Sequence, residues 1–321
     1  MASSSQRIKK VLIMLSTYNG EKFLARQLDS LYNQVGVDVH ILVRDDGSKD
    51  STLSILNDYV ANKSCMTILA GQNVGPAMSF YMLMKEAWEH HSDYDYYAFS
   101  DQDDEWDTNK MSSAVEKLDE SDNPYKLYYC KFRVINGCGD VIEQNSISVQ
   151  QPDYKNCLFR NPAPGCSQVF SIGLLERSVD IFGFINSPKF NKAYLHLHDV
   201  WTIHLACYLN AFIYADNSPL FSYRQHSANV TIYSENSYIK RYNTVKKDLE
   251  RIPNKYSHAA YLLLDMEGQY IDPEKKSFLR KVINYQDNFL KTIFFALTYP
   301  TVHKQMYVRL YAFYAIIKRL F

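Results

Sequence analysis

The chain has 321 residues, of which 46% are hydrophobic and 22% are charged. This length accommodates one large domain, or one domain with an appendage, and the composition excludes an extensively disordered protein. The six cysteines form no Cys-x-x-Cys pair, no secretory signal peptide opens the sequence, and no apolar run reaches the roughly 18 residues of a membrane span. We therefore expect a reduced, cytoplasmic protein that does not cross a membrane.

The net charge is zero, but the two parts of the chain have opposite signs. Residues 239–321 contain 15 Lys and Arg against 7 Asp and Glu, whereas residues 1–238 contain 20 against 28. The basic part is also rich in aromatic residues, and this combination favours contact with an anionic membrane surface. The alternative is a helical hairpin that packs on the rest of the protein with its Lys and Arg side chains solvated. Binding of nucleic acid is not expected, because the chain has no nucleic-acid motif.

Short apolar strands and amphipathic helices alternate through the first part of the chain. Strands are expected at residues 11–15, 39–43, 66–69 and 96–99, with helices between them. A polar turn follows each strand, at residues 16–20, 45–48, 73–76 and 100–104. Less regular strands are expected at 126–132, 167–171 and 212–215. Such alternation indicates a parallel sheet with helices on both faces, whose ligands bind at the carboxyl ends of the strands.

The fourth turn, Ser100-Asp101-Gln102-Asp103-Asp104, concentrates carboxylates directly after a buried strand. Closely spaced Asp oxygens suit a hard ion such as Mg²⁺ or Mn²⁺, which completes its coordination with phosphate oxygens and water. The chain has neither Gly-x-Gly-x-x-Gly nor a P-loop, so a metal ion is expected to hold the phosphates of a nucleotide. The alternative is an acidic turn that is only solvated or that starts a helix.

The polar turns carry motifs that occur together in one known family. Between residues 8 and 110 these motifs are, in order, Ser16-Thr17-Tyr18-Asn19, Asp45-Asp46-Gly47-Ser48, Asn73-Val74-Gly75 and Asp101-Gln102-Asp103-Asp104. The set resembles glycosyltransferase family 2, a large group of inverting enzymes with the GT-A fold. Three later motifs resemble the branch that contains bacterial rhamnosyltransferases of O-antigen and capsule assembly: Gly165-Cys166-Ser167, His198-Asp199-Val200-Trp201 and Tyr223-Arg224-Gln225-His226.

This resemblance implies the fold class and the domain organisation. The fold would be α/β of the GT-A type, a Rossmann-like, mostly parallel sheet flanked by helices, with a C-terminal helical appendage. A catalytic domain would occupy residues 1–238, with its nucleotide-binding half at about 8–110 and its acceptor half at about 111–238. Residues 239–321 would form the basic, aromatic helical region.

The resemblance also implies roles for individual residues. Tyr18 and Asp46 would touch the base and ribose, Arg224 would clamp the diphosphate, and Asp199 would be the general base. The full set expected to bind the nucleotide sugar is Thr17, Tyr18, Asn19, Asp45, Asp46, Asn73, Gly75, Asp101 and Arg224. The expected ligands of Mg²⁺ or Mn²⁺ are Asp101, Asp103 and His226. The expected sugar or acceptor pocket is Gly165, Cys166, His198 and Trp201.

Several of these positions have alternative interpretations. Asp199 could instead cap a helix over residues 200–209, because Asp is a good N-cap, or it could serve both roles. Trp201 could be a core residue rather than a sugar platform. The spacing of His196, His198 and His204 matches no metal site, so they are expected in the substrate pocket or the core. Family members often follow the histidine of the last motif with Gly-Asn-Asn, whereas this chain has Ser-Ala-Asn at 227–229, which puts the conformation of that loop in doubt.

An inverting sugar transfer needs one carboxylate to deprotonate the acceptor and a cation to neutralise the departing nucleoside diphosphate. We expect transfer of L-rhamnose from dTDP-rhamnose to a lipid-linked surface polysaccharide intermediate, at the inner face of the plasma membrane. The alternative donors are UDP-galactose, UDP-glucose and a UDP-N-acetylhexosamine. More distant alternatives are a sugar nucleotidyltransferase, which would carry Arg and Lys in a Gly-rich loop after its first strand, and a catalytically inactive membrane scaffold.

Overall fold

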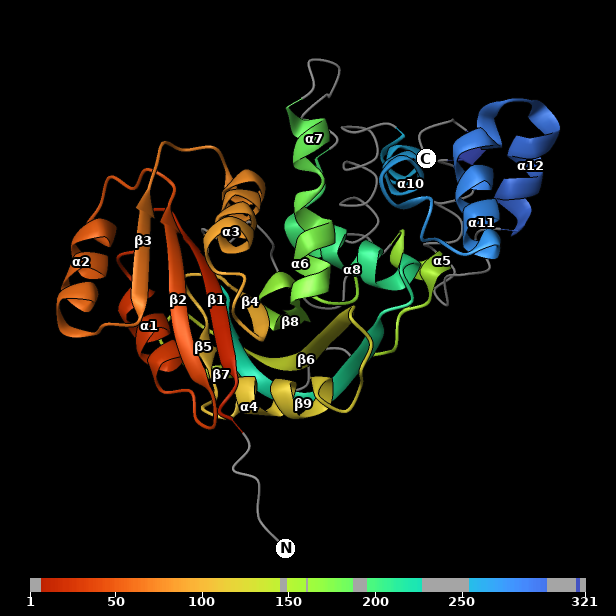
Figure 1. Ribbon diagram of the computed structural model, residues 1–321. Coiled ribbons are helices and arrows are strands. Elements are labelled where there is room, and N and C mark those ends of the chain that lie inside the picture. The colour runs from red at the N-terminus through yellow and green to blue at the C-terminus, as the bar shows by residue number, and fades with distance from the viewer. Residues whose placement is uncertain are drawn as a thin grey trace, which may run out of the picture.

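A computed structural model describes residues 7–144, 149–159, 161–186, 195–226, 254–298 and 316–317. These residues form a nine-stranded sheet in the order β3-β2-β1-β4-β8-β6-β9-β5, with β7 paired to β6 (Figure 1). The first four strands are parallel, as predicted: β1 (Lys10–Thr17), β2 (Asp38–Asp45), β3 (Met66–Ala70) and β4 (Tyr96–Ser100). The helices between them are α1 (Leu24–Tyr32), α2 (Thr52–Asn62) and α3 (Pro76–His90).

The second half of the sheet is mixed. Strand β8 (Gln168–Ser171) is antiparallel to both β4 and β6 (Lys126–Ile135), and β9 (Phe212–Arg224) is parallel to β6. Strand β9 is much longer than predicted, because polar residues interrupt its apolar pattern where its register with β6 shifts. The short strands β5 (Glu105–Trp106) and β7 (Val141–Glu143) were not predicted. The expected α/β fold with a largely parallel sheet flanked by helices is confirmed.

Helices cover both faces of this sheet because the side chains of β1 alternate between two cores. Leu12 and Met14 pack with α3, whereas Val11, Ile13 and Leu15 pack with α1 and α4 (Lys110–Leu118). The first core also receives α6 (Ile172–Val179) and α8 (His198–Tyr208). The remaining short helices between β7 and β9 are α5 (Tyr154–Cys157), α7 (Phe182–Ile185) and the 3₁₀ turn η1 (Gly165–Ser167).

The C-terminal helices extend the first core rather than forming a separate one. They are α10 (Lys255–Glu267), α11 (Pro273–Ile283), the 3₁₀ turn η3 (Asn284–Gln286) and α12 (Phe289–Thr298). Leu263 of α10 and Leu279 of α11 are fully buried in the same cluster as Trp201 of α8. The Nζ atom of Lys275 donates to the carbonyl oxygen of Cys207 at 2.7 Å. Within the described part of the chain, no helix has both the length and the apolar character needed to cross a membrane.

Candidate functional site

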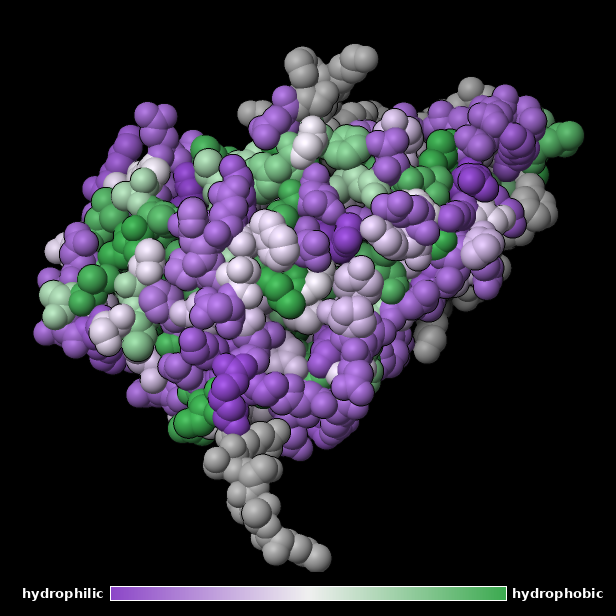
Figure 2. Space-filling model, viewed as in Figure 1, coloured by the Kyte–Doolittle hydropathy of each residue, from purple (hydrophilic) through white to green (hydrophobic). Residues whose placement is uncertain are grey.

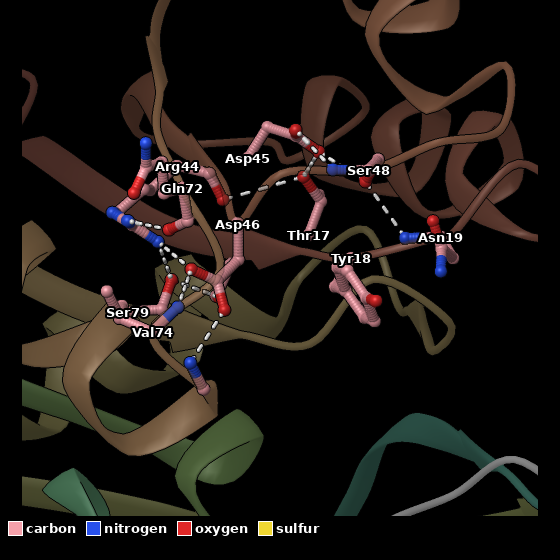
Figure 3. Close-up of polar contacts among 12 residues, drawn as sticks. Thr17, Tyr18, Asn19, Arg44, Asp45, Asp46, Ser48, Gln72, Val74 and Ser79 are labelled. Carbon is pink, nitrogen blue, oxygen red and sulfur yellow. Dashed lines mark hydrogen bonds and ion pairs between the residues drawn. The ribbon is translucent and has the colours of Figure 1, made fainter.

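Asp45, at the end of β2, ties two of the polar turns together (Figure 3). Its carboxylate accepts hydrogen bonds from the hydroxyl of Thr17 at 3.1 Å and from the backbone N–H of Ser48 at 2.9 Å. Asp45 is fully buried, so these protein partners replace the water that the carboxylate would otherwise bind. Asp45 therefore holds the ends of β1 and β2 together.

Asp46, the next residue, fixes the turn that follows β3. Its two oxygens accept from the backbone N–H groups of Val74 and Gly75, each at 2.9 Å, and Arg44 forms an ion pair with the same carboxylate. Gly75 has φ of 85°, a conformation that favours glycine, and Pro76 then starts α3. Asp46 is 3% exposed, so it positions the turn that contains the exposed Asn73.

The side chain of Tyr18, in the turn after β1, is exposed to solvent. Its ring is 44% exposed and carries no dashed contact in Figure 3. Its backbone is held by Gln102, whose side-chain oxygen accepts from the Tyr18 N–H at 2.8 Å and whose amide donates to the Tyr18 carbonyl at 3.0 Å. Asn19, in the left-handed region with φ of 48°, accepts from the backbone N–H of Lys49 at 2.9 Å. Gln102 thus joins the turn after β1 to the acidic turn after β4.

The acidic turn is anchored from behind by Arg224, the last residue of β9. Arg224 is fully buried; its Nε atom donates to the Asp103 carbonyl at 2.9 Å, and its guanidinium forms an ion pair with Glu105. Its backbone N–H donates to the carboxylate of Asp104 at 3.1 Å. This arrangement corrects our expectation that Arg224 clamps the diphosphate: the guanidinium is committed to the protein behind the turn and holds the carboxylates in place.

His226 lies beside Asp103 of this turn. Its Nε2 atom is 2.8 Å from the Asp103 carboxylate, and its ring packs on Phe23 with centroids 4.9 Å apart. A neutral imidazole and a carboxylate both ligate Mn²⁺. The structure therefore brings together two of the three expected metal ligands, although they are 123 residues apart in the chain.

A buried lysine that the sequence analysis did not single out lies beneath the acidic turn. Lys110, the first residue of α4, is fully buried, and its Nζ atom donates to the carbonyl oxygen of Cys166 at 2.7 Å. The ammonium group also lies over the Trp106 ring, 3.0 Å from its centroid. Burial lowers the pKa of Lys110 to about 8, against the opposing effect of the nearby Asp104 and Asp101.

Asp101 lies in the acidic turn, close to Cys166 of η1. Oxygen atoms of Asp101 and Asp104 and the sulfur of Cys166 lie within 4.8 Å of one another. Burial raises the pKa of Asp101 to about 7, and the carboxylates of Asp103 and Asp199 add to this effect. Asp103 and Asp199 are therefore near enough to Asp101 for their charges to disfavour its ionised form.

Asp199 lies in the first turn of α8 and is largely buried. One of its oxygens accepts from the backbone N–H of Val200 at 2.8 Å, and the other accepts from the side-chain amide of Asn161 at 2.7 Å. Burial raises the pKa of Asp199 to about 6, while these hydrogen bonds oppose the rise. Asp199 thus bonds to the helix N-terminus and also interacts electrostatically with Asp101. The capping interpretation is corrected, because the N-cap of α8 is Leu197 and Asp199 lies inside the first turn.

The side chain of Asn161 has its orientation fixed by its own turn. Its Oδ1 atom accepts from the backbone N–H of Ala163 at 3.0 Å, which leaves the Nδ2 group to face Asp199. The sequence analysis did not single out Asn161, because an isolated Asn before Pro reads only as a turn signal.

The other expected pocket residues are packed around Asp199. His198 stacks on Phe80 with ring centroids 3.7 Å apart, and a Cβ atom on Gly165 would come within 2.8 Å of the His198 Nε2 atom. Neither ring nitrogen of His198 has a hydrogen-bond partner among the described residues. Trp201 is fully buried in the core and offers no surface for stacking on a sugar, so we correct its assignment to a packing residue. Residues 227–229, where the motif departs from the family pattern, lie outside the described residues.

The comparison with protein families decides which family this site belongs to. The model of "Glycosyl transferase family 2" matches residues 12–180, which is more than half of the chain. The chain belongs to this family. In agreement, the dTDP-rhamnosyl transferase RfbG of Shigella flexneri is 32% identical over 219 residues, which cover 67% of this chain and 72% of that protein. The resemblance to family 2 inferred from the motifs is confirmed.

Solved structures share the fold of this chain. S. aureus TarS 1-349 in complex with UDP has a TM-score of 0.57 and 17% identity, and the match covers 97% of this chain and 88% of that one. The complex of the same protein with UDP-GlcNAc also has a TM-score of 0.57, with 16% identity and coverage of 97% and 81%. The chain therefore has the same overall fold as these two solved structures.

Proposed function

We propose that this family 2 glycosyltransferase is an inverting enzyme in which Asp199 deprotonates the acceptor hydroxyl. The observation that supports the proposal is that Asp199 lies close enough to Asp101 of the acidic turn for the two carboxylates to interact electrostatically. A general base works best when its pKa lies near the working pH, and the pKa of about 6 for Asp199 leaves it ionised at neutral pH. Asn161 and the start of α8 hold the base in position.

The charges around the acidic turn favour one bound divalent cation. Four carboxyl groups, those of Asp101, Asp103, Asp104 and Glu105, lie in the turn and its continuation. Three basic side chains, those of Lys110, Arg224 and Arg26, lie near them in the described part of the chain. The carboxyl groups outnumber these basic side chains, and a Mg²⁺ or Mn²⁺ ion would offset the excess negative charge.

The donor atoms in this turn fit such an ion. Asp101, Asp103 and His226 offer carboxylate oxygens and an imidazole nitrogen, which suit Mn²⁺ and, for the oxygens, Mg²⁺. When bound, the ion would neutralise the nucleoside diphosphate as it departs. Arg224 would meanwhile keep the carboxylates in place from behind, because its guanidinium donates to the Asp103 carbonyl on the buried side of the turn.

We infer dTDP-L-rhamnose as the donor. The support is the 32% identity to a protein named as a dTDP-rhamnosyl transferase, together with the motif resemblance. Slow nucleotide release by the purified protein tests the inference, measured for dTDP-rhamnose, UDP-galactose, UDP-glucose and UDP-N-acetylglucosamine, with Mn²⁺, Mg²⁺ or EDTA. Metal-dependent release from dTDP-rhamnose alone is expected. Release from a UDP-sugar instead would reassign the donor, and absence of both release and nucleotide binding would favour an inactive scaffold.

For the acceptor we propose a lipid-diphosphate-linked glycan of surface polysaccharide assembly, used at the inner face of the plasma membrane. The motif resemblance to the rhamnosyltransferase branch supports this assignment. The excess of basic residues in residues 239–321 supports the location, because such residues are attracted to anionic lipids.

Replacing Tyr18 with Ala is expected to weaken nucleotide binding by about 10-fold or more. Stacking of an aromatic ring on a base contributes roughly 1–3 kcal/mol, and the exposed Tyr18 ring is free to supply it. Tyr18→Phe is the matched control, because it keeps the ring and the backbone bonds to Gln102. Calorimetric titration with dTDP gives the dissociation constants. Equal affinity of Tyr18→Ala and wild type for dTDP would show that the nucleotide base does not stack on Tyr18.

Replacing Asn161 with Ala is expected to move the acidic limb of the rate profile to higher pH by about 1 unit. The Asn161 amide stabilises the ionised form of Asp199, and a hydrogen bond to a charged group is worth roughly 1.5–3 kcal/mol. Removing it raises the pKa of Asp199, so more of the base is protonated near pH 6.

The control for this experiment is Asn123→Ala. Asn123 forms the same turn, since its Oδ1 atom accepts from the backbone N–H of Tyr125, but its amide donates to the uncharged carbonyl of Asn210. The pH dependence of kcat is measured for both variants. If the acidic limb were unchanged in Asn161→Ala, the hydrogen bond from Asn161 would not set the pKa of the general base.

A further inference from the structure

Two adjacent apolar side chains project from the start of α12. Phe289 is 70% exposed and Leu290 is 78% exposed, the highest values among the large hydrophobic residues that the structure describes. Figure 1 places α12 at the end of the molecule opposite to α2, and Figure 2 shows hydrophobic surface protruding at that end beside hydrophilic surface. Isolated apolar residues on a surface are common, but an adjacent, almost fully exposed pair at an extremity indicates a contact site.

The exposure of this pair is built into the fold. Asn288 starts the helix by accepting the backbone N–H of Lys291 at 2.9 Å, which sets Phe289 and Leu290 in the first turn. One turn further on, the Thr292 hydroxyl donates to the carbonyl oxygen of Tyr285 at 2.9 Å. The buried Tyr285 ring stacks on Phe295, with centroids 5.3 Å apart. The opposite side of α12 is thus fastened to η3.

Cationic side chains accompany the apolar pair. Arg280 and Lys281 are exposed in the last turn of α11, only one short 3₁₀ turn before α12, and Lys291 follows the pair directly. Between residues 275 and 298 the chain contains five Lys and Arg but one acidic residue, Asp287, which pairs with Lys291 at 2.7 Å. A protruding apolar pair within a basic surface matches the interface of an anionic bilayer, where side chains enter the acyl boundary and cations face phosphate groups.

We propose that Phe289 and Leu290 insert into the interface of an anionic lipid bilayer, with Arg280, Lys281 and Lys291 contacting the lipid headgroups. The contact would hold α12 against the membrane while the crevice stays in water. This inference is independent of the donor and of the catalytic assignment, because bilayer binding requires neither.

Sedimentation of the full-length protein with vesicles tests this proposal. Wild type is expected to bind vesicles of phosphatidylglycerol and phosphatidylcholine, to bind less at high salt, and to bind pure phosphatidylcholine poorly. The double variant Phe289→Ser, Leu290→Ser should bind the anionic vesicles at least about 10-fold more weakly. The matched control is Val141→Ser, Ile142→Ser, which changes an adjacent pair of exposed apolar residues, 45% and 57% exposed, on β7.

A fluorescence measurement gives a second readout. Phe289→Trp should show a blue shift of its emission with anionic vesicles and none without them. Two results would overturn the proposal: equal vesicle binding by wild type and the Phe289, Leu290 double variant, or concentration-dependent dimerisation of wild type that the double variant abolishes. Donor hydrolysis should be unchanged in the double variant, so a failure of the catalytic proposal would be recognised separately.

Discussion

Replacing Asp199 with Asn is expected to lower kcat for sugar transfer by about 10³-fold while leaving the dissociation constant of the donor nucleotide nearly unchanged. General-base catalysis contributes roughly 10²–10⁴-fold, and an amide cannot accept the acceptor proton at neutral pH. The side chain of Asn is nearly isosteric, so the start of α8 and the neighbouring His198 should keep their places. Initial rates with the acceptor and calorimetric titration with the nucleotide measure the two quantities.

The control for this variant is Asp153→Asn. Asp153 also accepts from the N-terminal N–H groups of a helix, those of Lys155 and Asn156, and from an Asn side chain, but it is exposed and lies at α5. A rate for Asp199→Asn close to that of Asp153→Asn would exclude Asp199 as the base. The carboxylate would then act only through its bonds to α8 and Asn161.

The order of strands and the location of the site could be predicted because both depend on local patterns. Each apolar run of the first part of the chain ends in a polar turn, and parallel strands bring these turns to one edge of the sheet. The sequence therefore predicts that Asp45, Asp46 and Asp101 lie at the same edge of the sheet. Local patterns do not show in which direction a side chain at such a turn points. Asp45 and Asp46 turn inward to hydroxyl and backbone N–H groups, and Tyr18 turns outward.

The remaining differences arise from contacts between distant parts of the chain. Arg224 reaches Glu105 across 119 residues, and Lys110 reaches the Cys166 carbonyl across 56. A motif containing Arg shows that a cation is near the site, but only the pairing of β9 with β5 shows that it lies behind the acidic turn. The same applies to Trp201, whose burial depends on α10 and α11 sharing its core. Tertiary packing decided these positions.

Replacing Asp103 with Ala is expected to weaken Mn²⁺ binding by at least about 100-fold and to abolish metal-dependent nucleotide release. Changes to residues that merely orient a metal ligand typically cost 10–100-fold in affinity, and the loss of a ligand should cost no less. His226, whose Nε2 atom is 2.8 Å from the Asp103 carboxylate, would lose this contact. Of the three expected ligands, only Asp101 and His226 would remain to hold the ion. Electron paramagnetic resonance of free Mn²⁺, titrated with and without nucleotide, measures the affinity without depending on turnover.

The control variant is Asp107→Asn. It tests whether the effect of Asp103→Ala comes from the loss of a metal ligand or from the loss of a negative charge near the site. Asp107 is four residues along the same segment, but its carboxylate faces Arg133, whose Nη1 atom donates to it at 3.1 Å, rather than the crevice. Treating wild type with EDTA should reproduce the defect of Asp103→Ala, and added Mn²⁺ should restore wild type but not the variant. If Asp103→Ala kept wild-type Mn²⁺ affinity, the carboxylate would be needed only for its hydrogen bond to His226. The excess negative charge of the acidic turn would then have to be reduced by protonation, which the raised pKa of Asp101, about 7, would permit only near or below neutral pH.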